Sequence, residues 1–143
     1  MSKKEAVRVV LYRYQNRILQ IFLGKRPDWS KLEADKYQLI GGQQKKDEIP
    51  INAAAREIIE EILEFKPKDL ASLVKALALI SEFPNDDTGW LTTAFLMEVE
   101  KITLDTQEMP TADWFSIEQL GNLKLAFDHL LIIEDFLKLI TKN

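Results

Sequence analysis

The chain of 143 residues has the usual size of one domain, and with 46% hydrophobic and 29% charged residues it has the balance of a globular protein. We therefore expect a single domain over residues 1–143. A net charge of -4 and a pI of about 5.1 argue against a nucleic-acid partner, because phosphate backbones are held mainly by clustered Lys and Arg. The absence of cysteine excludes disulfides, thiolate catalysis and cysteine-based metal centres.

The first residues, MSKKEAVRVVLYRY, are charged and lack the apolar core of a signal peptide. No run approaches the roughly 20 apolar residues of a membrane span. We therefore expect a cytoplasmic protein with no membrane partner. An acidic protein that acts on a phosphorylated substrate would need metal ions between like charges, so clustered acidic side chains are the feature to look for.

The first half of the chain predicts three strands and a helix. Runs of β-branched and aromatic residues at 7–14 and 18–23, separated by a polar turn, predict a hairpin. The polar stretch 25–36 predicts an exposed loop that contains Trp29. A short strand at 37–40 runs into two glycines, and Pro50 suits the first turn of a helix over about 51–65 that Pro67 ends.

The second half predicts mainly strands and then a helix. The apolar runs 73–83 and 90–99 read as strands joined by the turn-rich segment 84–89. A short last strand is expected at 113–115. Apolar residues at helical spacing over 125–140 predict a C-terminal amphipathic helix.

The predicted first helix carries four glutamates at i, i+3, i+4 and i+7, which fall on one narrow stripe; they are Glu57, Glu60, Glu61 and Glu64. The opposite face is apolar, so the helix can pack on a sheet with its acids turned outward; its residues are Ala55, Ile58, Ile59 and Ile62. Like charges at this spacing repel, and Arg56 alone lies among them. A hard cation such as Mg²⁺ or Mn²⁺ would relieve the repulsion. A plain solvated acidic face is the alternative.

Residues at fixed distances before these acids decide between the two interpretations. The segment GGQQKKDEIPINAAAREIIEEILE resembles the signature of the Nudix family: Gly, five residues, Glu, seven residues, then Arg-Glu-aliphatic-any-Glu-Glu-any-Gly-aliphatic. Seven positions match in type and spacing: Gly42, Glu48, Arg56, Glu57, Ile58, Glu60 and Glu61. Such a long match is far more specific than a short motif.

The resemblance implies an α+β fold, an α/β/α sandwich with a mixed sheet. It implies that Glu57, Glu60 and Glu61 ligate Mg²⁺ or Mn²⁺, with Gly41 offering a backbone carbonyl, and that the metal activates water. It also implies an ion pair between Glu48 and Arg56. The chain departs from the signature at Leu63, where the family has Gly, and at Glu64, where it has an aliphatic residue; we expect Leu63 to prolong the helix until Pro67.

The segment ADWFSIEQLGNLKLAFDH looks like the ending of Nudix proteins related to ADP-ribose pyrophosphatases and to regulators of NAD metabolism. The resemblance favours ADP-ribose or a similar nucleotide sugar as substrate. The arginines that such relatives carry between two central strands are missing from 83–88, which weakens that assignment. Within the segment, Asp128 is expected to cap the last helix and His129 to be structural.

Other candidate site residues depend on residue type alone. Glu108 is the candidate catalytic base, with Asp105 and a helix glutamate as the alternatives. Possible substrate contacts are the aromatic residues Trp29, Tyr37 and Trp90, which suit base stacking, and the basic residues Lys25 and Arg26, which suit phosphate. Core, rim or solvated surface positions are the alternative for each.

Three rival functions remain. A nucleoside triphosphate pyrophosphatase would share the metal site and differ in releasing pyrophosphate. A non-catalytic module that binds an NAD-related metabolite usually carries a DNA-binding segment, which we do not expect here because Asn143 follows the last helix closely. The third rival is an acidic interaction domain without a ligand, whose stability should not depend on Mg²⁺ or Mn²⁺. The resemblance also suggests a homodimer.

Overall fold

Strand β1 (Lys4–Gln15) is the central element of the fold, because it pairs with three other strands. The computed structural model describes residues 4–26, 33–62, 69–85, 89–99 and 111–141. The other strands are β2 (Ile18–Lys25), β3 (Tyr37–Gln38), β4 (Ile40–Gln43), β5 (Ala78–Asn85), β6 (Trp90–Glu98) and β7 (Thr111–Ser116). The helices are α1 (Pro50–Glu61), α2 (Leu70–Ala76), α3 (Ile117–Leu120) and α4 (His129–Ile140).

The seven strands form one mixed sheet with the path β3-β2-β1-β6-β5, while β4 pairs with β1 and β7 with β2. Strands β1 and β6 run parallel from the pair Lys4 and Trp90 to the pair Tyr12 and Glu98. The pairs of β1 with β2 and with β4 are antiparallel. The mixed sheet predicted from the family resemblance is therefore confirmed.

The predicted hairpin between β1 and β2 is also confirmed. Its turn residues Asn16 and Arg17 both have positive φ, at 52° and 68°. Two consecutive left-handed residues match the right-handed twist of the flanking strands, and Asn tolerates that conformation better than most residues.

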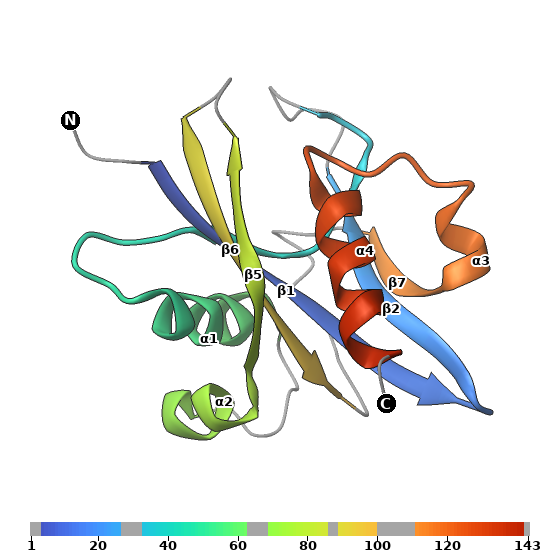
Figure 1. Ribbon diagram of the computed structural model, residues 1–143, viewed down its shortest axis with the longest axis horizontal. Coiled ribbons are helices and arrows are strands. Elements are labelled where there is room, and N and C mark those ends of the chain that lie inside the picture. The colour runs from blue at the N-terminus through green and yellow to red at the C-terminus, as the bar shows by residue number, and fades with distance from the viewer. Residues whose placement is uncertain (1–3, 27–32, 63–68, 86–88, 100–110, 142–143) are drawn as a thin grey trace.

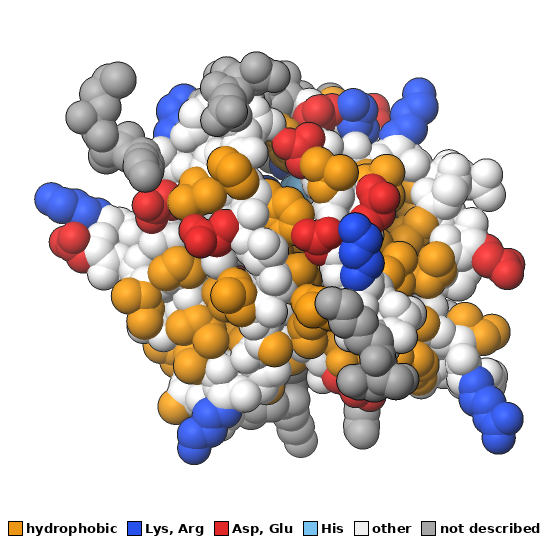
Figure 2. Space-filling view, in the orientation of Figure 1, with side chains coloured by type: hydrophobic (Ala, Val, Ile, Leu, Met, Phe, Trp, Pro, Cys, Tyr) orange, Lys and Arg blue, Asp and Glu red, His pale blue; other side chains and the backbone are white. Residues whose placement is uncertain are grey.

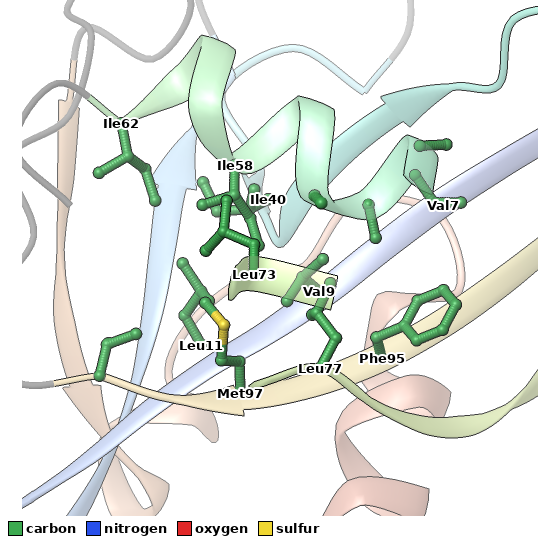
Figure 3. Packing of buried hydrophobic residues seen from close by; sticks show 14 of the residues in the cluster. Val7, Val9, Leu11, Ile40, Ile58, Ile62, Leu73, Leu77, Phe95 and Met97 are labelled. Carbon is green, nitrogen blue, oxygen red and sulfur yellow. The ribbon is translucent and has the colours of Figure 1, made fainter. Parts of the chain in front are cut away.

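Helices cover both faces of the sheet, with α1 and α2 on one face and α4 on the other (Figure 1). The alternation of side chains along β1 divides them between two cores. Val7, Val9 and Leu11 face α1, where they pack with Ile58 and Leu73 (Figure 3). Val10 faces the other way, toward α4. The expected α/β/α sandwich is thus present, and no helix among the described residues is long and apolar enough to cross a membrane.

Helix α1 ends earlier than the sequence predicts. Its last residue is Glu61, and Ile62 has extended geometry with φ -121° and ψ 118°. The Ile62 side chain is only 2% exposed and packs in the core on the α1 side of the sheet. Burial of this β-branched side chain therefore outweighs continuation of the helix, and the predicted extension is wrong at Ile62. Leu63, Glu64 and Pro67 lie outside the described residues.

Residues 73–76 are helical and not the start of a strand. Helix α2 begins after Asp69, whose carboxylate accepts a hydrogen bond of 3.0 Å from the Ser72 amide. Leu73 and Leu77 lie four residues apart and are both buried, at 0% and 7% exposure. The N-cap and the i, i+4 spacing were signals of a helix, but the apolar run that continues into β5 masked them.

The C-terminal helix α4 begins at His129, four residues later than predicted. Asp128 makes no capping hydrogen bond, so its predicted capping role is wrong. Its carboxylate instead accepts a 2.8 Å hydrogen bond from Asn85 Nδ2 at the end of β5. The short helix α3 was not predicted, although Ser116 and Gln119 form a capping box at its start.

Strand β4 approaches β1 so closely that Gly41 has no room for a side chain. A Cβ there would lie 2.0 Å from the Val7 carbonyl oxygen, and φ is +151°. We therefore predict that Gly41→Ala lowers the free energy of unfolding by at least about 2 kcal/mol, measured by urea denaturation.

The control is Gly121→Ala, because a Cβ at Gly121 would meet its nearest atom at 3.7 Å. This control should leave stability unchanged or slightly raised, since alanine restricts the unfolded chain. Equal stabilities of the Gly41 variant and the wild type would contradict the close approach of β4 to β1.

Candidate active site

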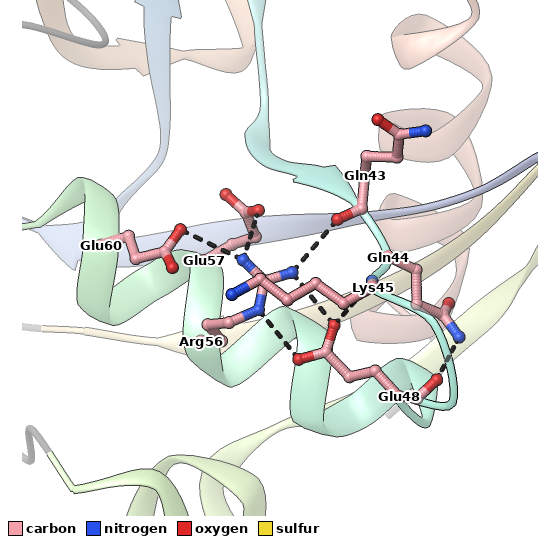
Figure 4. A network of polar contacts seen from close by, with 7 residues as sticks. All are labelled: Gln43, Gln44, Lys45, Glu48, Arg56, Glu57 and Glu60. Carbon is pink, nitrogen blue, oxygen red and sulfur yellow. Dashed lines mark hydrogen bonds and ion pairs between the residues drawn. The ribbon is translucent and has the colours of Figure 1, made fainter.

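Arg56 on α1 is the centre of a polar network that joins the helix to the loop before it (Figure 4). Its Nε and Nη2 atoms donate to Glu48 Oε2 and Oε1 at 2.8 and 3.0 Å, so the guanidinium meets the carboxylate side by side. Nη2 also donates to the Gln43 carbonyl oxygen at 3.1 Å. These contacts fix the end of β4 and the loop of residues 44–49 against α1.

The environment of Glu48 favours its ionised form. The hydrogen bond from Arg56 is the largest of several causes that lower the pKa of the Glu48 carboxyl. The Lys45 amide donates to the same carboxylate at 3.0 Å. Conversely, the hydrogen bond to Glu48 raises the pKa of Arg56. The pair is well covered, with side-chain exposures of 17% for Arg56 and 15% for Glu48.

The same guanidinium reaches the glutamates that follow it on α1. Arg56 Nη1 donates to Glu57 Oε1 at 3.0 Å and to Glu60 Oε2 at 3.1 Å. One cationic nitrogen thus lies between two carboxylates and relieves their repulsion. The Glu60 side chain is 46% exposed, so it is the member of this group that has freedom to turn.

The expectation that the glutamates of α1 all point outward is wrong for two of them. Glu57 and Glu61 are only 7% and 3% exposed, whereas Ile59, expected on the apolar face, is 41% exposed. The buried Glu57 carboxylate takes the space that a side chain at Gly42 would fill, since a Cβ there would lie 2.6 Å from Glu57 Oε1. Gly42 therefore allows α1 to bring this carboxylate onto the backbone of β4.

Arg8 on β1 belongs to this charged group, although sequence reasoning did not identify it. Its pKa is lowered chiefly by burial and also by the charge of Arg26, whereas the carboxylates of Glu61 and Glu57 act to raise it. Its Nη1 donates to the Leu39 carbonyl oxygen at 3.0 Å. The available signal was a single charge inside the apolar run VRVVL.

His129 is buried at the start of α4, with 4% of its surface exposed. Its Nδ1 accepts a 3.1 Å hydrogen bond from the Leu39 amide. Burial holds the pKa of His129 well below its usual value, and the charges of Arg8 and Arg26 lower it further. A neutral imidazole that supports the backbone of the strand region agrees with the structural role expected for this residue.

The predicted substrate contacts are distributed over several elements. Arg26 donates from Nη1 to Gln38 Oε1 at 2.8 Å, and its Cζ lies 5.1 Å from the Phe127 ring centroid. The Tyr37 ring packs on Phe115, with centroids 5.1 Å apart. Trp90 is partly exposed at the start of β6, where Lys4 Nζ lies 5.9 Å from its ring centroid. Trp29, Asp105 and Glu108 lie outside the described residues.

The donor set of this group suits a hard divalent cation, because carboxylate and carbonyl oxygens are the ligands that Mg²⁺ and Mn²⁺ prefer. Within the parts of the chain that are described, no three Asp, Glu or His side chains are already arranged as a metal site. Arg56 Nη1 lies between Glu57 and Glu60 instead. The close fit of Glu57 over Gly42 shows that this carboxylate is positioned by the fold.

The ion pair between Glu48 and Arg56 generates a prediction on stability. Because the pKa of Glu48 is lowered in the folded state, its contribution is complete above the unfolded carboxyl pKa of about 4.3 and is lost as pH falls through the folded value. Glu48→Gln should therefore cost about 1 to 2 kcal/mol of unfolding free energy at pH 7 and less below pH 4. Urea denaturation across this pH range measures the difference.

A suitable control is Glu134→Gln, because Glu134 is exposed on α4. This substitution should change stability little at either pH. A Glu48→Gln variant as stable as the wild type at pH 7 would show that the pair does not brace the loop.

Comparison with known proteins agrees with this architecture. A family model described as the NUDIX domain matches residues 2–136. No curated protein matches the chain. The fold is similar to that of the NUDIX domain of Shewanella oneidensis NrtR complexed with ADP ribose, with a TM-score of 0.79, 21% identity and coverage of 99% of this chain and 90% of that one. It is also similar to a mutT/nudix family protein from Listeria innocua, with a TM-score of 0.76, 21% identity and coverage of 99% of this chain and 96% of that one. A C. elegans Ap4A hydrolase has a TM-score of 0.71 and 14% identity, with coverage of 98% of this chain and 99% of that one. At these identities the structures show the fold alone, whereas the family model covers nearly the whole chain. The chain therefore belongs to the NUDIX domain family.

Proposed function

We propose that this protein is a Mg²⁺- or Mn²⁺-dependent hydrolase that cleaves the diphosphate linkage of a nucleoside diphosphate joined to another group. The observation that carries the proposal is the positioning of the α1 carboxylates. Glu57 is set over Gly42, and the adjacent Arg56 is held by Glu48 and by the Gln43 carbonyl. The guanidinium of Arg56 offsets part of the repulsion among the glutamates of α1, and a bound cation would offset the rest.

The charge of the site supports a divalent cation. The group contains four carboxylates and two guanidiniums, which leave two negative charges for one divalent cation to balance; these residues are Glu48, Glu57, Glu60, Glu61, Arg8 and Arg56. We assign Glu57, Glu60, Glu61 and the Gly41 carbonyl as its ligands. When bound, the cation would activate water and neutralise charge on the diphosphate.

The protein's own residues then have separate tasks. Arg56 keeps its two hydrogen bonds to Glu48 and its contact with Gln43 when Glu60 turns away, so the helix stays in place. The exposed Glu60 is the residue that can move from Arg56 to a cation. The buried Glu57 and Glu61 provide fixed oxygens. Glu108 remains our candidate for the base that takes the proton from water.

The substrate class that we propose is ADP-ribose or a similar nucleotide sugar. Support comes from the resemblance of residues 112–129 to proteins that act on such molecules and from the ADP ribose bound in the similar NrtR domain. Arg26, Trp29, Tyr37 and Trp90 are the proposed substrate contacts. Arg26 is already oriented by Gln38, and Trp90 is partly exposed.

Substitution of Glu60 tests this function. We predict that wild-type protein hydrolyses one member of a panel of ADP-ribose, NADH, sugar nucleotides, diadenosine polyphosphates and nucleoside triphosphates only with Mg²⁺ or Mn²⁺. Glu60→Gln should lower this turnover by more than about a hundredfold, because a neutral amide is a poor ligand for a hard cation. Phosphate-product release measures the rates.

The matched control is Glu134→Gln, the same substitution at an exposed site on the opposite side of the sheet. It should leave turnover unchanged. AMP plus ribose phosphate as products would identify the proposed reaction, whereas pyrophosphate would identify a nucleoside triphosphate pyrophosphatase. Binding of a nucleotide without any turnover would contradict a hydrolase and favour a metabolite-binding module.

A further inference from the structure

Arg8 lies in the interior of the central strand, on the face of the sheet that is covered by α4. Side chains alternate along a strand, so Arg8 shares this face with Val10, which packs toward α4. The residues paired with Arg8 on the two neighbouring strands are Gly41 on β4 and Ala94 on β6. Both are small, and the Arg8 side chain takes the space beside Gly41, since a Cβ there would lie 2.8 Å from Arg8 Cδ.

The guanidinium of Arg8 makes few contacts with the protein. Of its five N–H donors, the described residues accept one hydrogen bond, from Nη1 to the Leu39 carbonyl oxygen at 3.0 Å. Among the described side chains, no carboxylate lies within ion-pair distance of it. None of its nitrogens is fully buried without a partner, so the remaining donors are open to solvent or to a ligand.

The surroundings of Arg8 favour the approach of an anion. Burial and the nearby charge of Arg26 both disfavour its cationic form, while Glu57 and Glu61 favour it from the α1 side. With a divalent cation on the carboxylates, the group of charges counted above would be neutral, so an approaching anion would meet no net negative charge there. Neutral His129 adds no negative charge beside it.

The Arg8 side chain is partly exposed. Arg8 and His129 contact the same residue, Leu39, through its carbonyl oxygen and its amide. In Figure 2, which looks onto the β5 edge with α4 to the right, a small pale blue area of histidine is visible between the surrounding side chains. Figure 1 shows that α4 begins at the same end of the sheet as β3.

We propose that Arg8 binds phosphoryl oxygens of the substrate, next to the carboxylates of α1. The planar guanidinium presents paired donors that match a phosphate group, and a group held partly out of water binds it more strongly than an exposed one. The inference rests on the proposed function, because it places the diphosphate between the cation site and Arg8. It makes Arg8 a substrate-binding residue on the strand rather than on a loop.

Calorimetric binding of ADP tests the inference without turnover. We compare wild type, Arg8→Gln and Arg8→Lys in EDTA and again with Mn²⁺, with thermal unfolding as a check of folding. Arg8→Gln should weaken ADP binding by about tenfold to a hundredfold in both conditions, which corresponds to loss of charge-assisted hydrogen bonds. Arg8→Lys keeps the charge and the aliphatic part of the side chain but lacks the paired guanidinium donors. Its affinity for ADP should therefore lie between those of the wild type and Arg8→Gln.

The matched control is Arg17→Gln, which removes the same charge at the exposed hairpin turn. It should bind ADP like the wild type. Wild-type affinity in both Arg8 variants, or no ADP binding by the wild type, would overturn the inference. If Arg8→Gln does not fold, the Arg8→Lys result decides, and wild-type affinity there overturns the inference as well.

The two proposals can fail separately. Metal-dependent hydrolysis with an ADP affinity that does not depend on Arg8 would remove only the role of Arg8. An Arg8-dependent affinity for ADP without hydrolysis of any substrate would remove only the hydrolase function.

Discussion

The bidentate ion pair between Arg56 and Glu48 is the interaction on which the site depends. It joins the first helix to the loop that follows β4, and the added hydrogen bond to the Gln43 carbonyl sets the end of that strand. Exposed ion pairs contribute little, but this one is mostly covered and has paired hydrogen bonds. Because Glu57 follows Arg56 directly and lies over Gly42, any shift of the helix along β4 would move the carboxylate off the glycine.

Strand β1 connects this network to the other half of the molecule. Its alternating side chains contribute to both cores, and its pairing with β4 brings Arg8 beside Gly41. The α1 carboxylates act on Arg8 from one side, while Arg26 and His129 interact with it electrostatically as well. The proposed cation and the proposed phosphate contact would therefore be neighbours because one strand and two glycines bring their residues together.

Patterns of neighbouring residues in the sequence predicted the hairpin and two of the helices, because short-range interactions determine these elements. The hairpin followed from alternating apolar runs around Asn16, and α1 and α4 followed from helical periodicity. The pairing of Glu48 with Arg56 was implied by the resemblance to the Nudix signature. The end of α1 was missed because burial of Ile62 sets it through tertiary packing. Helix α2 was missed because its local signals lie within an apolar run. The burial of Glu57 and Glu61 and the approach of Arg8 arise from contacts between distant segments, which periodicity does not reveal.

The central claim is that the glutamates of α1 hold a divalent cation. A crystal structure of the protein with Mn²⁺, examined by anomalous scattering, tests it most directly. The account predicts an anomalous peak about 2.0 to 2.3 Å from carboxylate oxygens of Glu57, Glu60 and Glu61, with Glu60 turned away from Arg56 and the pair of Arg56 with Glu48 intact. A fully occupied Mn²⁺ elsewhere, or no Mn²⁺ while Arg56 still bridges Glu57 and Glu60, would contradict it.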